Sequence, residues 1–402
     1  MTEGYLTQIN NKVIKINQQD SNNKINILIT GDFSPINRIE SICKNKDYDK
    51  IYGELLSILK NKDLSITNIE TPLTTHKNKI RKRGPYLVAN PICIHGIKYG
   101  DFDIATLSNN HILDYGKTGL FATIDACESV GIKTVGAGKN IDEAKKPLYI
   151  EIKGKTIAIL NFTECEFSIA EIDKAGANPL DPIGNYYQIL EAKRNADIVI
   201  LIIHGGNELN PLPNLQMVKI YHFFADLGVT AIIGHHPHCI SGFEIYNNTP
   251  IFYSLGNFIF DIEQQKESWY EGYFINLEIN KNSVNKIYLF PYFQCKEKIG
   301  LYLMNKTEEK IFLKKIEDYS NIIKDPNLLL KNWIEFCDSK KASYLAKLLS
   351  FNTLEKHLYK KNLFTKLLLK EQKMLLLLNL FRCESHREAI IDILKNVLKN
   401  KK

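Results

Sequence analysis

The stretch INILITGD, residues 25–32, decides the fold class of this chain. Its first six residues are mostly Ile and Leu, as in a buried β-strand, and Gly31 and Asp32 then end the run. Similar runs recur along the next two hundred residues. We predict further strands at Leu64–Asn68, Ile104–Leu107, Thr134–Gly136, Thr156–Phe162, Ile198–Ile203, Ala231–Ile233 and Ile251–Ser254.

Amphipathic stretches between these runs predict helices, at Asp49–Lys60, Gly116–Val130, Tyr187–Ala196 and Asn214–Leu227. Strands that alternate with helices indicate βαβ units and buried parallel strands. Two later segments, Gly272–Ile279 and Val284–Gln294, are separated by a short polar turn and predict an antiparallel hairpin. The sequence therefore predicts a mixed α/β domain with extra β structure towards its end.

Three regions follow from the pattern: a polar N-terminal segment at 1–24, the α/β domain at 25–300 and a helical, basic extension at 301–402. The whole chain carries a formal charge of +7, and residues 341–402 hold 14 Lys and Arg against 5 Asp and Glu, so they carry 14 − 5 = +9. The remainder is 7 − 9 = −2. The basic tail is either a solvated helical surface or a contact for an acidic polymer, a membrane surface or a partner.

Several classes of protein are disfavoured by composition. The N-terminus lacks the apolar core of a signal peptide, and no apolar run reaches the about 20 residues of a spanning helix. The eight cysteines form no CxxC spacing, which indicates scattered thiols in a reducing compartment. Aromatic platforms interleaved with Arg, which nucleic-acid grooves use, are not evident. We expect a cytoplasmic protein without a transmembrane segment and without a nucleic-acid partner.

Polar side chains of the kinds that bind metals follow the predicted strands one after another. Because ligands bind beyond the carboxyl ends of strands in open α/β sheets, these residues are expected to meet. His, Asp, Glu and Asn supply the nitrogen and oxygen donors that suit Mn, Fe, Zn or Mg. We expect one or two divalent ions. The clusters are Asp32; Asn68 and Glu70; Asn109, Asn110, His111 and Asp114; His204 and Glu208; His235, His236 and His238; Asn257 and Asp261.

Seven strings carry a family resemblance. They are GD (31–32), NIETPLT (68–74), LSNNHILDYG (107–116), GAGKNIDEA (136–144), HGGNE (204–208), GHHPH (234–238) and YSLGNFIFD (253–261). In order and spacing they resemble the bacterial capsule-synthesis CapA family, over roughly residues 25–295. That family is associated with poly-γ-glutamate and polysaccharide capsule production and is similar to the calcineurin-like metallophosphoesterases. The resemblance implies a four-layer αββα sandwich, with two mixed sheets packed face to face and helices outside.

The resemblance also implies roles for particular residues. The metal ligands it implies are Asp32, Glu70, Asn110, His204, His236 and His238. His111 would give a proton to the leaving oxygen, with Asp114 orienting its ring. Residues expected to contact the substrate or to hydrogen-bond to the metal ligands are Asn68, Asn109, Glu164, Glu208, His235 and Asn257.

The sequence departs from the phosphoesterase pattern at two of these positions. Ser34 stands where that superfamily usually has a metal-binding histidine, and Glu70 replaces a bridging aspartate. Both changes weaken one of two metal sites. A basic loop, with Lys79, Arg81, Lys82 and Arg83 in HKNKIRKRGPY, follows Glu70 and is either solvated or suited to an anionic substrate.

The function expected from these residues is metal-dependent hydrolysis of a phosphoester in an anionic or polymeric substrate of bacterial capsule or surface-polymer biosynthesis, with capsule-synthesis proteins as partners. Two alternatives stay open. One is a non-catalytic polymer-binding or assembly subunit of a capsule-synthesis complex. The other is an amide or γ-glutamyl hydrolase that uses the same metal site.

Overall fold

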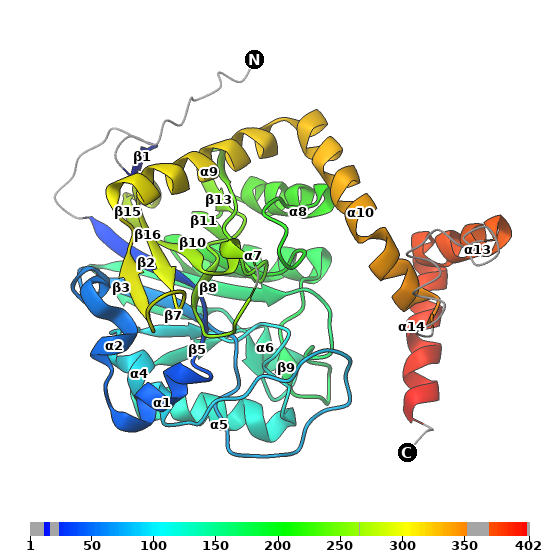
Figure 1. Cartoon of the computed structure of the whole chain (residues 1–402), viewed down its shortest axis with the longest axis horizontal. Helices are drawn as coiled ribbons and strands as arrows, with labels where there is room; N and C mark the ends of the chain where they lie inside the picture. Colours follow the sequence, from blue (N-terminus) through cyan, green and yellow to red (C-terminus); the bar gives the residue numbers. More distant parts are fainter. Residues whose placement is uncertain (1–11, 17–23, 265, 352–369, 400–402) are drawn as a thin grey trace. The chain divides into compact units, whose positions relative to one another are not determined.

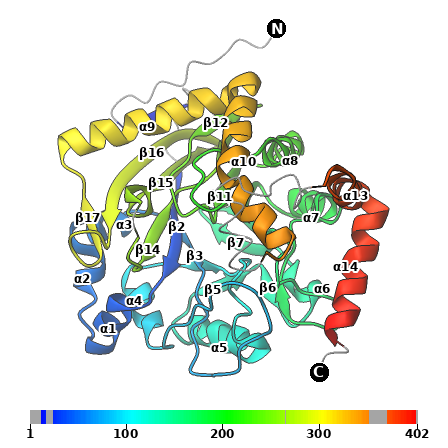
Figure 2. The same cartoon turned by 45° about the vertical axis from the view of Figure 1, so that its right-hand side comes forward.

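The structure is a computed structural model that describes residues 12–16, 24–264, 266–351 and 370–399. The chain divides into two compact units, Met1–Trp333 and Ile334–Lys402. Both large sheets and all the predicted site residues belong to the first unit (Figures 1 and 2).

A nine-stranded mixed sheet forms one half of the first unit. At its centre, β2 (Ile25–Ser34) pairs in parallel with β3 (Leu64–Ile69) and β14 (Asn257–Phe260), and antiparallel with β15 (Glu271–Asn280). The main path runs β1-β16-β15-β2-β3-β4-β5, with β17 paired to β16. The other strands are β1 (Val13–Lys15), β4 (Ile104–Thr106), β5 (Lys133–Val135), β16 (Ser283–Gln294) and β17 (Leu301–Leu303).

A six-stranded sheet, ordered β12-β13-β11-β10-β8-β7, forms the other half. Its inner strands are parallel to one another, and each edge strand is antiparallel to its neighbour. The strands are β7 (Leu148–Ile152), β8 (Lys155–Thr163), β10 (Ile198–His204), β11 (Ala231–His235), β12 (Phe243–Tyr246) and β13 (Thr249–Phe252). Separately, β6 (Ala137–Gly138) pairs with β9 (Gly176–Ala177).

Alternation of side chains across the strands builds two cores from one sequence pattern. In β10, Ile198, Ile200 and Ile202 lie in the core shared with the nine-stranded sheet. Their neighbours Val199 and Leu201 point the other way and pack with the helices that cover the six-stranded sheet. Both faces of the strand are therefore buried, which explains its unbroken run of Ile, Leu and Val.

Helices cover the outer face of each sheet, so the unit has the four αββα layers that the family resemblance implies. On the nine-stranded sheet lie α1 (Arg38–Asn45), α4 (Cys93–Tyr99) and α5 (Gly116–Ser129), and on the six-stranded sheet lie α7 (Pro182–Asn195) and α8 (Leu215–Asp226) (Figures 1 and 2). Five of the eight cysteines are buried in these layers.

The eight predicted strands and the hairpin are present. One predicted helix is wrong, because it is not continuous. Residues Asp49–Lys60 form α2 (Asp49–Tyr52), a 3-10 turn (Gly53–Leu55) and α3 (Leu56–Leu59). The break is at Gly53, whose φ of +50° lies in the left-handed region that an α-helix cannot use.

The C-terminal helices begin within the first unit. Phe312 and Ile316 of α9 (Lys306–Lys324) belong to the core between the two sheets. α10 (Pro326–Leu348) crosses the boundary between the units. In the second unit, α13 (Glu371–Arg382) and α14 (Glu384–Lys399) contact each other.

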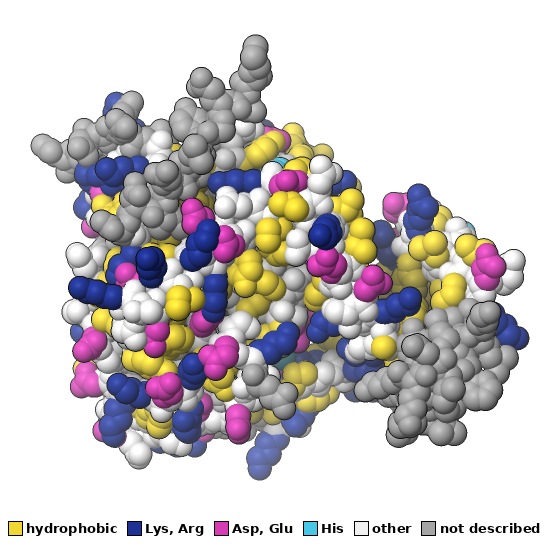
Figure 3. All heavy atoms as spheres, turned by 45° about the horizontal axis from the view of Figure 1, so that its top comes forward, with side chains coloured by type: hydrophobic (Ala, Val, Ile, Leu, Met, Phe, Trp, Pro, Cys, Tyr) yellow, Lys and Arg dark blue, Asp and Glu magenta, His cyan; other side chains and the backbone are white. Residues whose placement is uncertain are grey.

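The predicted N-terminal segment, 1–24, lies mostly outside the described residues, apart from residue 24 and residues 12–16, which contain β1. Among the described residues, no helix is both long and apolar enough to cross a membrane. On the face of the first unit in Figure 3, Lys and Arg are interspersed with Asp and Glu, in keeping with the small net charge of residues 1–340.

The core between the sheets predicts a contrast between two isoleucines. Ile200 is fully buried between the sheets, whereas Ile183 on α7 is 76% exposed. Ile200→Ala leaves a cavity and should lower the free energy of unfolding by about 2–5 kcal/mol. Ile183→Ala should change it by no more than about 0.5 kcal/mol. Urea denaturation of both variants measures the difference, and equal losses would contradict this arrangement.

Candidate metal centre

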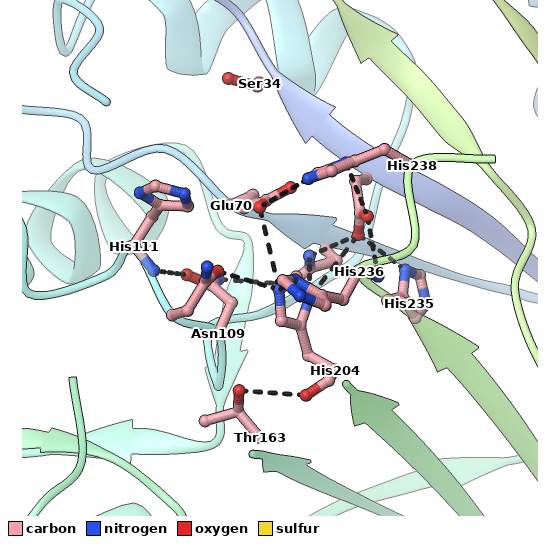
Figure 4. Close-up of polar contacts among 12 residues, drawn as sticks. Ser34, Glu70, Asn109, His111, Thr163, His204, His235, His236 and His238 are labelled. Carbon is pink, nitrogen blue, oxygen red and sulfur yellow. Dashed lines mark hydrogen bonds and ion pairs between the residues drawn. The ribbon is translucent and has the colours of Figure 1, made fainter. Parts of the chain in front are cut away.

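The ends of strands from both sheets converge on one buried cluster (Figure 4). In the nine-stranded sheet, Asp32 of β2 is in register with Asn68 of β3 and with Asn257 of β14. In the six-stranded sheet, His204 of β10 is in register with His235 of β11. The two sheets therefore bring distant parts of the sequence to a common edge, as the position of the polar residues after the strands predicts.

Asp32 is held by hydrogen bonds from three directions. Its Oδ1 accepts from Asn68 Nδ2 at 2.7 Å and from His235 Nδ1 at 3.0 Å, and its Oδ2 accepts from the backbone N–H of His236 at 3.1 Å. Burial alone would raise the pKa of this carboxyl, but the His235 hydrogen bond and the nearby imidazoles outweigh burial and hold the pKa well below its usual range. Asp32 is therefore a fixed anion.

A glycine brings β14 against β2 beside this aspartate. A Cβ atom on Gly31 would lie 2.0 Å from the carbonyl oxygen of Gly256, so only glycine permits the approach. Asp32 N–H donates to that same carbonyl at 3.3 Å, and Asn257 follows directly in the chain. The Gly-Asp pair that ends the first strand is thus required by packing as well as by the carboxylate.

Glu70 differs from Asp32 because no donor among the described residues reaches it. Its side chain is fully buried, and neither carboxylate oxygen has a hydrogen-bond partner among the described residues. Oε1 lies 3.6 Å from His238 Nε2 and 3.8 Å from His204 Nε2. Burial, followed by the charge of Asp32, raises the pKa of Glu70 well above its usual value. A buried carboxylate without a partner is costly, so this residue fits a cation that the protein does not itself provide.

His238 presents a free lone pair towards Glu70. Asn257 Nδ2 donates to the Trp269 carbonyl at 3.1 Å, which turns Asn257 Oδ1 towards His238 Nδ1 at 2.9 Å. His238 Nδ1 must then carry the proton, and Nε2 is left as an electron donor. Two electron donors, Nε2 and the Glu70 carboxylate, thus face each other, as ligands of one cation do.

His236 and His238 flank Pro237 in a strained stretch of backbone. Their φ values are +96° and +55°, in the left-handed region that non-glycine residues seldom adopt. Such strain persists where the surrounding structure fixes it, and it is common at functional sites. In this stretch, both imidazoles place a ring nitrogen within 4.8 Å of a Glu70 carboxylate oxygen.

His204 and Asn110 complete the cluster. His204 Nε2 lies 3.1 Å from Asn110 Oδ1 and 3.1 Å from His236 Nδ1. Burial, more than any other cause, lowers the pKa of His204 and His238, and it lowers the pKa of His236 to about 4. The three imidazoles are accordingly neutral near pH 7 and have lone pairs for a metal.

These residues fit a divalent cation. Glu70, His236 and His238 each place a ligand atom within 4.8 Å of the other two, and all three are buried. One carboxylate and neutral imidazoles are the donor set that Zn, Mn and Fe accept. Asp32, Asn110 and His204 lie around this trio through the contacts described above.

His111 lies beside Asp114 at the edge of the cluster. His111 Nδ1 is 2.7 Å from Asp114 Oδ2, and the backbone N–H of His111 donates to Asn109 Oδ1 at 3.1 Å. Asn109 Nδ2 in turn donates to the Ile69 carbonyl at 2.9 Å. Asn109 therefore ties the His111 turn to the strand that leads to Glu70.

Some predicted residues do not join the cluster. Ser34 is hydrogen-bonded to Thr71 Oγ1 and lies apart from the histidines (Figure 4), while Asp261 forms an ion pair with Arg38. Glu208 is exposed, but its charge contributes to the raised pKa of Glu70. Glu164 is partly buried, and burial raises its pKa.

Sequence reasoning missed two contacts of the cluster. The His238 ring lies 5.0 Å from the Trp269 ring, between centroids, and no motif around this tryptophan indicates that contact. The sequence indicates Lys82 only as part of a basic loop, whereas its Nζ pairs with Asp114. Neither contact has a signal in the local sequence, because each depends on a loop that returns from elsewhere in the chain.

Comparison with known proteins places this cluster in a family context. The sequence matches the family described as bacterial capsule synthesis protein PGA_cap over residues 26–262. It is 34% identical over 245 residues to the PGA biosynthesis protein CapA of Bacillus subtilis, covering 60% of this chain and 64% of that protein. It is 31% identical over 249 residues to the capsule biosynthesis protein CapA of Bacillus anthracis, covering 60% and 61%.

The chain therefore spans somewhat less than two thirds of the length of these curated relatives. Among solved structures, it is similar to a putative 5′-nucleotidase from Staphylococcus aureus, with 16% identity, a TM-score of 0.43, and coverage of 73% of this chain and 58% of that one. Since the family match alone spans more than half of its residues, the chain belongs to the bacterial capsule synthesis protein PGA_cap family.

Proposed function

We propose that this protein is a metal-dependent hydrolase that cleaves a phosphoester in an anionic substrate of capsule or surface-polymer biosynthesis. The observation that carries the proposal is the buried Glu70 carboxylate, which faces the Nε2 lone pair of His238 and has no hydrogen-bond donor in the part of the chain that the structure describes. The capsule context rests on relatives whose names place them in capsule or PGA biosynthesis.

Glu70, His236 and His238 would hold the metal, with Asp32, His204 and Asn110 as the surrounding ligands. A divalent cation bound there supplies Lewis-acid polarisation and lowers the pKa of water. Residues that would not bind the metal orient those that would. Asn257 sets the tautomer of His238 by a hydrogen bond, and Asn68 and His235 are hydrogen-bonded to the Asp32 carboxylate.

His111 would act as the proton donor to the departing oxygen. Asp114 engages Nδ1 of its ring, so Nε2 is the nitrogen left for a substrate. A positioned imidazole of this kind contributes about 10²–10⁴-fold to rate. Its side chain is 7% exposed, which keeps the proton away from bulk water.

Glu70→Gln tests the metal site. The substitution keeps the shape of the side chain and removes the charge, so affinity for Zn²⁺ or Mn²⁺ should fall at least about 100-fold. Metal should raise the melting temperature of the wild type but not of the variant. Without metal, Glu70→Gln should be at least as stable as the wild type, because the amide avoids the cost of burying a carboxyl group whose pKa is raised by burial.

Isothermal calorimetry and thermal melts with and without metal measure both effects. Glu278→Gln is the matched control, since Glu278 is a buried carboxylate at the far end of β15 that has protein partners in Asn285 and Tyr288. Equal metal affinity in Glu70→Gln and the wild type would overturn the assignment of Glu70.

His111→Ala tests the reaction. With bis(p-nitrophenyl) phosphate as substrate, kcat should fall about 10²–10⁴-fold while the metal content stays that of the wild type. Cleavage of a γ-glutamyl p-nitroanilide but not of the phosphoester would instead identify an amide hydrolase. An inactive wild type, with full capsule complementation by His111→Ala in a deletion strain, would identify an assembly subunit.

A further inference from the structure

We infer that Lys82 is a positioning residue of this site, whose buried ammonium holds the Asp114 carboxylate and, through it, the ring of His111. The inference rests on the proposed function for His111, and it assigns a task to a residue that the metal chemistry leaves unused. No motif points to Lys82, which is one of several basic residues in the loop that follows Glu70.

The contacts of Lys82 are unlike those of a surface lysine. Its side chain is 4% exposed, and its Nζ forms an ion pair with Oδ1 of Asp114, which is fully buried. The same Nζ lies 3.3 Å from His111 Nδ1. The other carboxylate oxygen, Oδ2, is hydrogen-bonded to His111 Nδ1 at 2.7 Å and accepts a hydrogen bond from the backbone N–H of Leu87 at 2.7 Å. Oδ2 of Asp114 is thus bonded from two sides, whereas Oδ1 has the ion pair with Lys82 but no hydrogen-bond partner among the described residues.

Hydrogen bonds within the loop hold Lys82 beside Asp114. The backbone N–H of Ile80 donates to the Asp114 carbonyl at 3.1 Å, and the Tyr86 hydroxyl donates to the Ile80 carbonyl at 2.7 Å. Lys82 Nζ lies 5.2 Å from the centre of the Tyr86 ring, in cation–π range. The loop is therefore held on both sides of Lys82.

The charges explain why an ammonium is needed. Asp32, Glu70 and Asp114 are all buried, and Asp114 is not among the residues that would hold a metal, so a metal would not compensate its charge. Lys82 provides that compensation from within the chain. Removing one partner of a buried ion pair leaves an uncompensated charge, which the structure relieves by moving the side chain or the loop. The ring of His111 would then lose its fixed acceptor.

The low exposure of the Lys82 side chain indicates a positioning role and not direct contact with a substrate. With 4% of its side chain exposed and its ammonium already engaged by Asp114, Lys82 does not reach a substrate. Its effect must pass through His111, so substitution should alter kcat and the state of the imidazole while substrate binding and metal binding are kept.

The experiment compares Lys82→Met and Lys82→Arg with Lys62→Met in the full chain. Lys62 is a matched control, because its side chain is also buried, at 6% exposed, and is paired with Asp101 outside the cluster. With bis(p-nitrophenyl) phosphate, Lys82→Met should lower kcat about 10–100-fold with KM within about threefold of the wild type. Lys82→Arg should recover most of the loss, and Lys62→Met should match the wild type.

A second measurement does not depend on turnover. Long-range ¹H–¹⁵N spectra of the histidine rings in the zinc-loaded protein, with His111 assigned by its absence in His111→Gln, report which ring nitrogen carries the proton. In the wild type and Lys82→Arg, we expect one sharp His111 signal, which reports a single ring environment with Nδ1 held against Asp114. In Lys82→Met, the His111 signal should shift or broaden. If the wild type hydrolyses no phosphoester, the proposed function fails, and these spectra still decide the part played by Lys82.

A double variant distinguishes a specific effect of Lys82 on Asp114 from a general loss of folding. In an Asp114→Asn background, no buried charge is left for Lys82 to hold, so adding Lys82→Met should change kcat by less than about twofold. Full additivity of the two losses would overturn the inference. Unchanged kcat and an unchanged His111 signal in Lys82→Met, or an equal loss in Lys62→Met, would also overturn it.

Discussion

The buried, unpartnered carboxylate of Glu70 is the constraint on which the rest of the site depends. Four strand ends from two sheets bring it beside neutral imidazoles, and none of the described side chains donates a hydrogen bond to it. A charge left in this condition costs several kcal/mol unless it is neutralised. The backbone of His236 and His238 is strained at the same place. The hydrogen bond from His238 Nδ1 to Asn257 leaves the lone pair of His238 Nε2 facing Glu70.

Three buried carboxylates in this cluster are compensated in three ways. Asp32 is satisfied by donors of the protein, namely Asn68, His235 and a backbone N–H. Asp114 is paired with the ammonium of Lys82. Glu70 alone has neither. Similar residues thus take different tasks because their surroundings differ: one is fixed as an anion, one orients His111, and one is left for a metal.

Much of this arrangement could be predicted from the sequence, because strand periodicity and the polar residues after each strand are local signals. Asp32, His204 and His236 lie where those signals place them, at strand ends that meet. Two kinds of feature could not be predicted. The break at Gly53 depends on a backbone angle that helical periodicity does not encode. The pairing of Lys82 with Asp114 depends on the return path of a loop, and charge composition cannot distinguish that lysine from its exposed neighbours.

Anomalous diffraction from crystals soaked in zinc or manganese tests the central claim most directly. The account predicts a single strong peak, or the stronger of two, about 2.0–2.2 Å from Glu70 and from a ring nitrogen of both His236 and His238. Crystals that bind the ion elsewhere, with the Glu70 carboxylate hydrogen-bonded to protein groups and turned away from the two histidines, would contradict it.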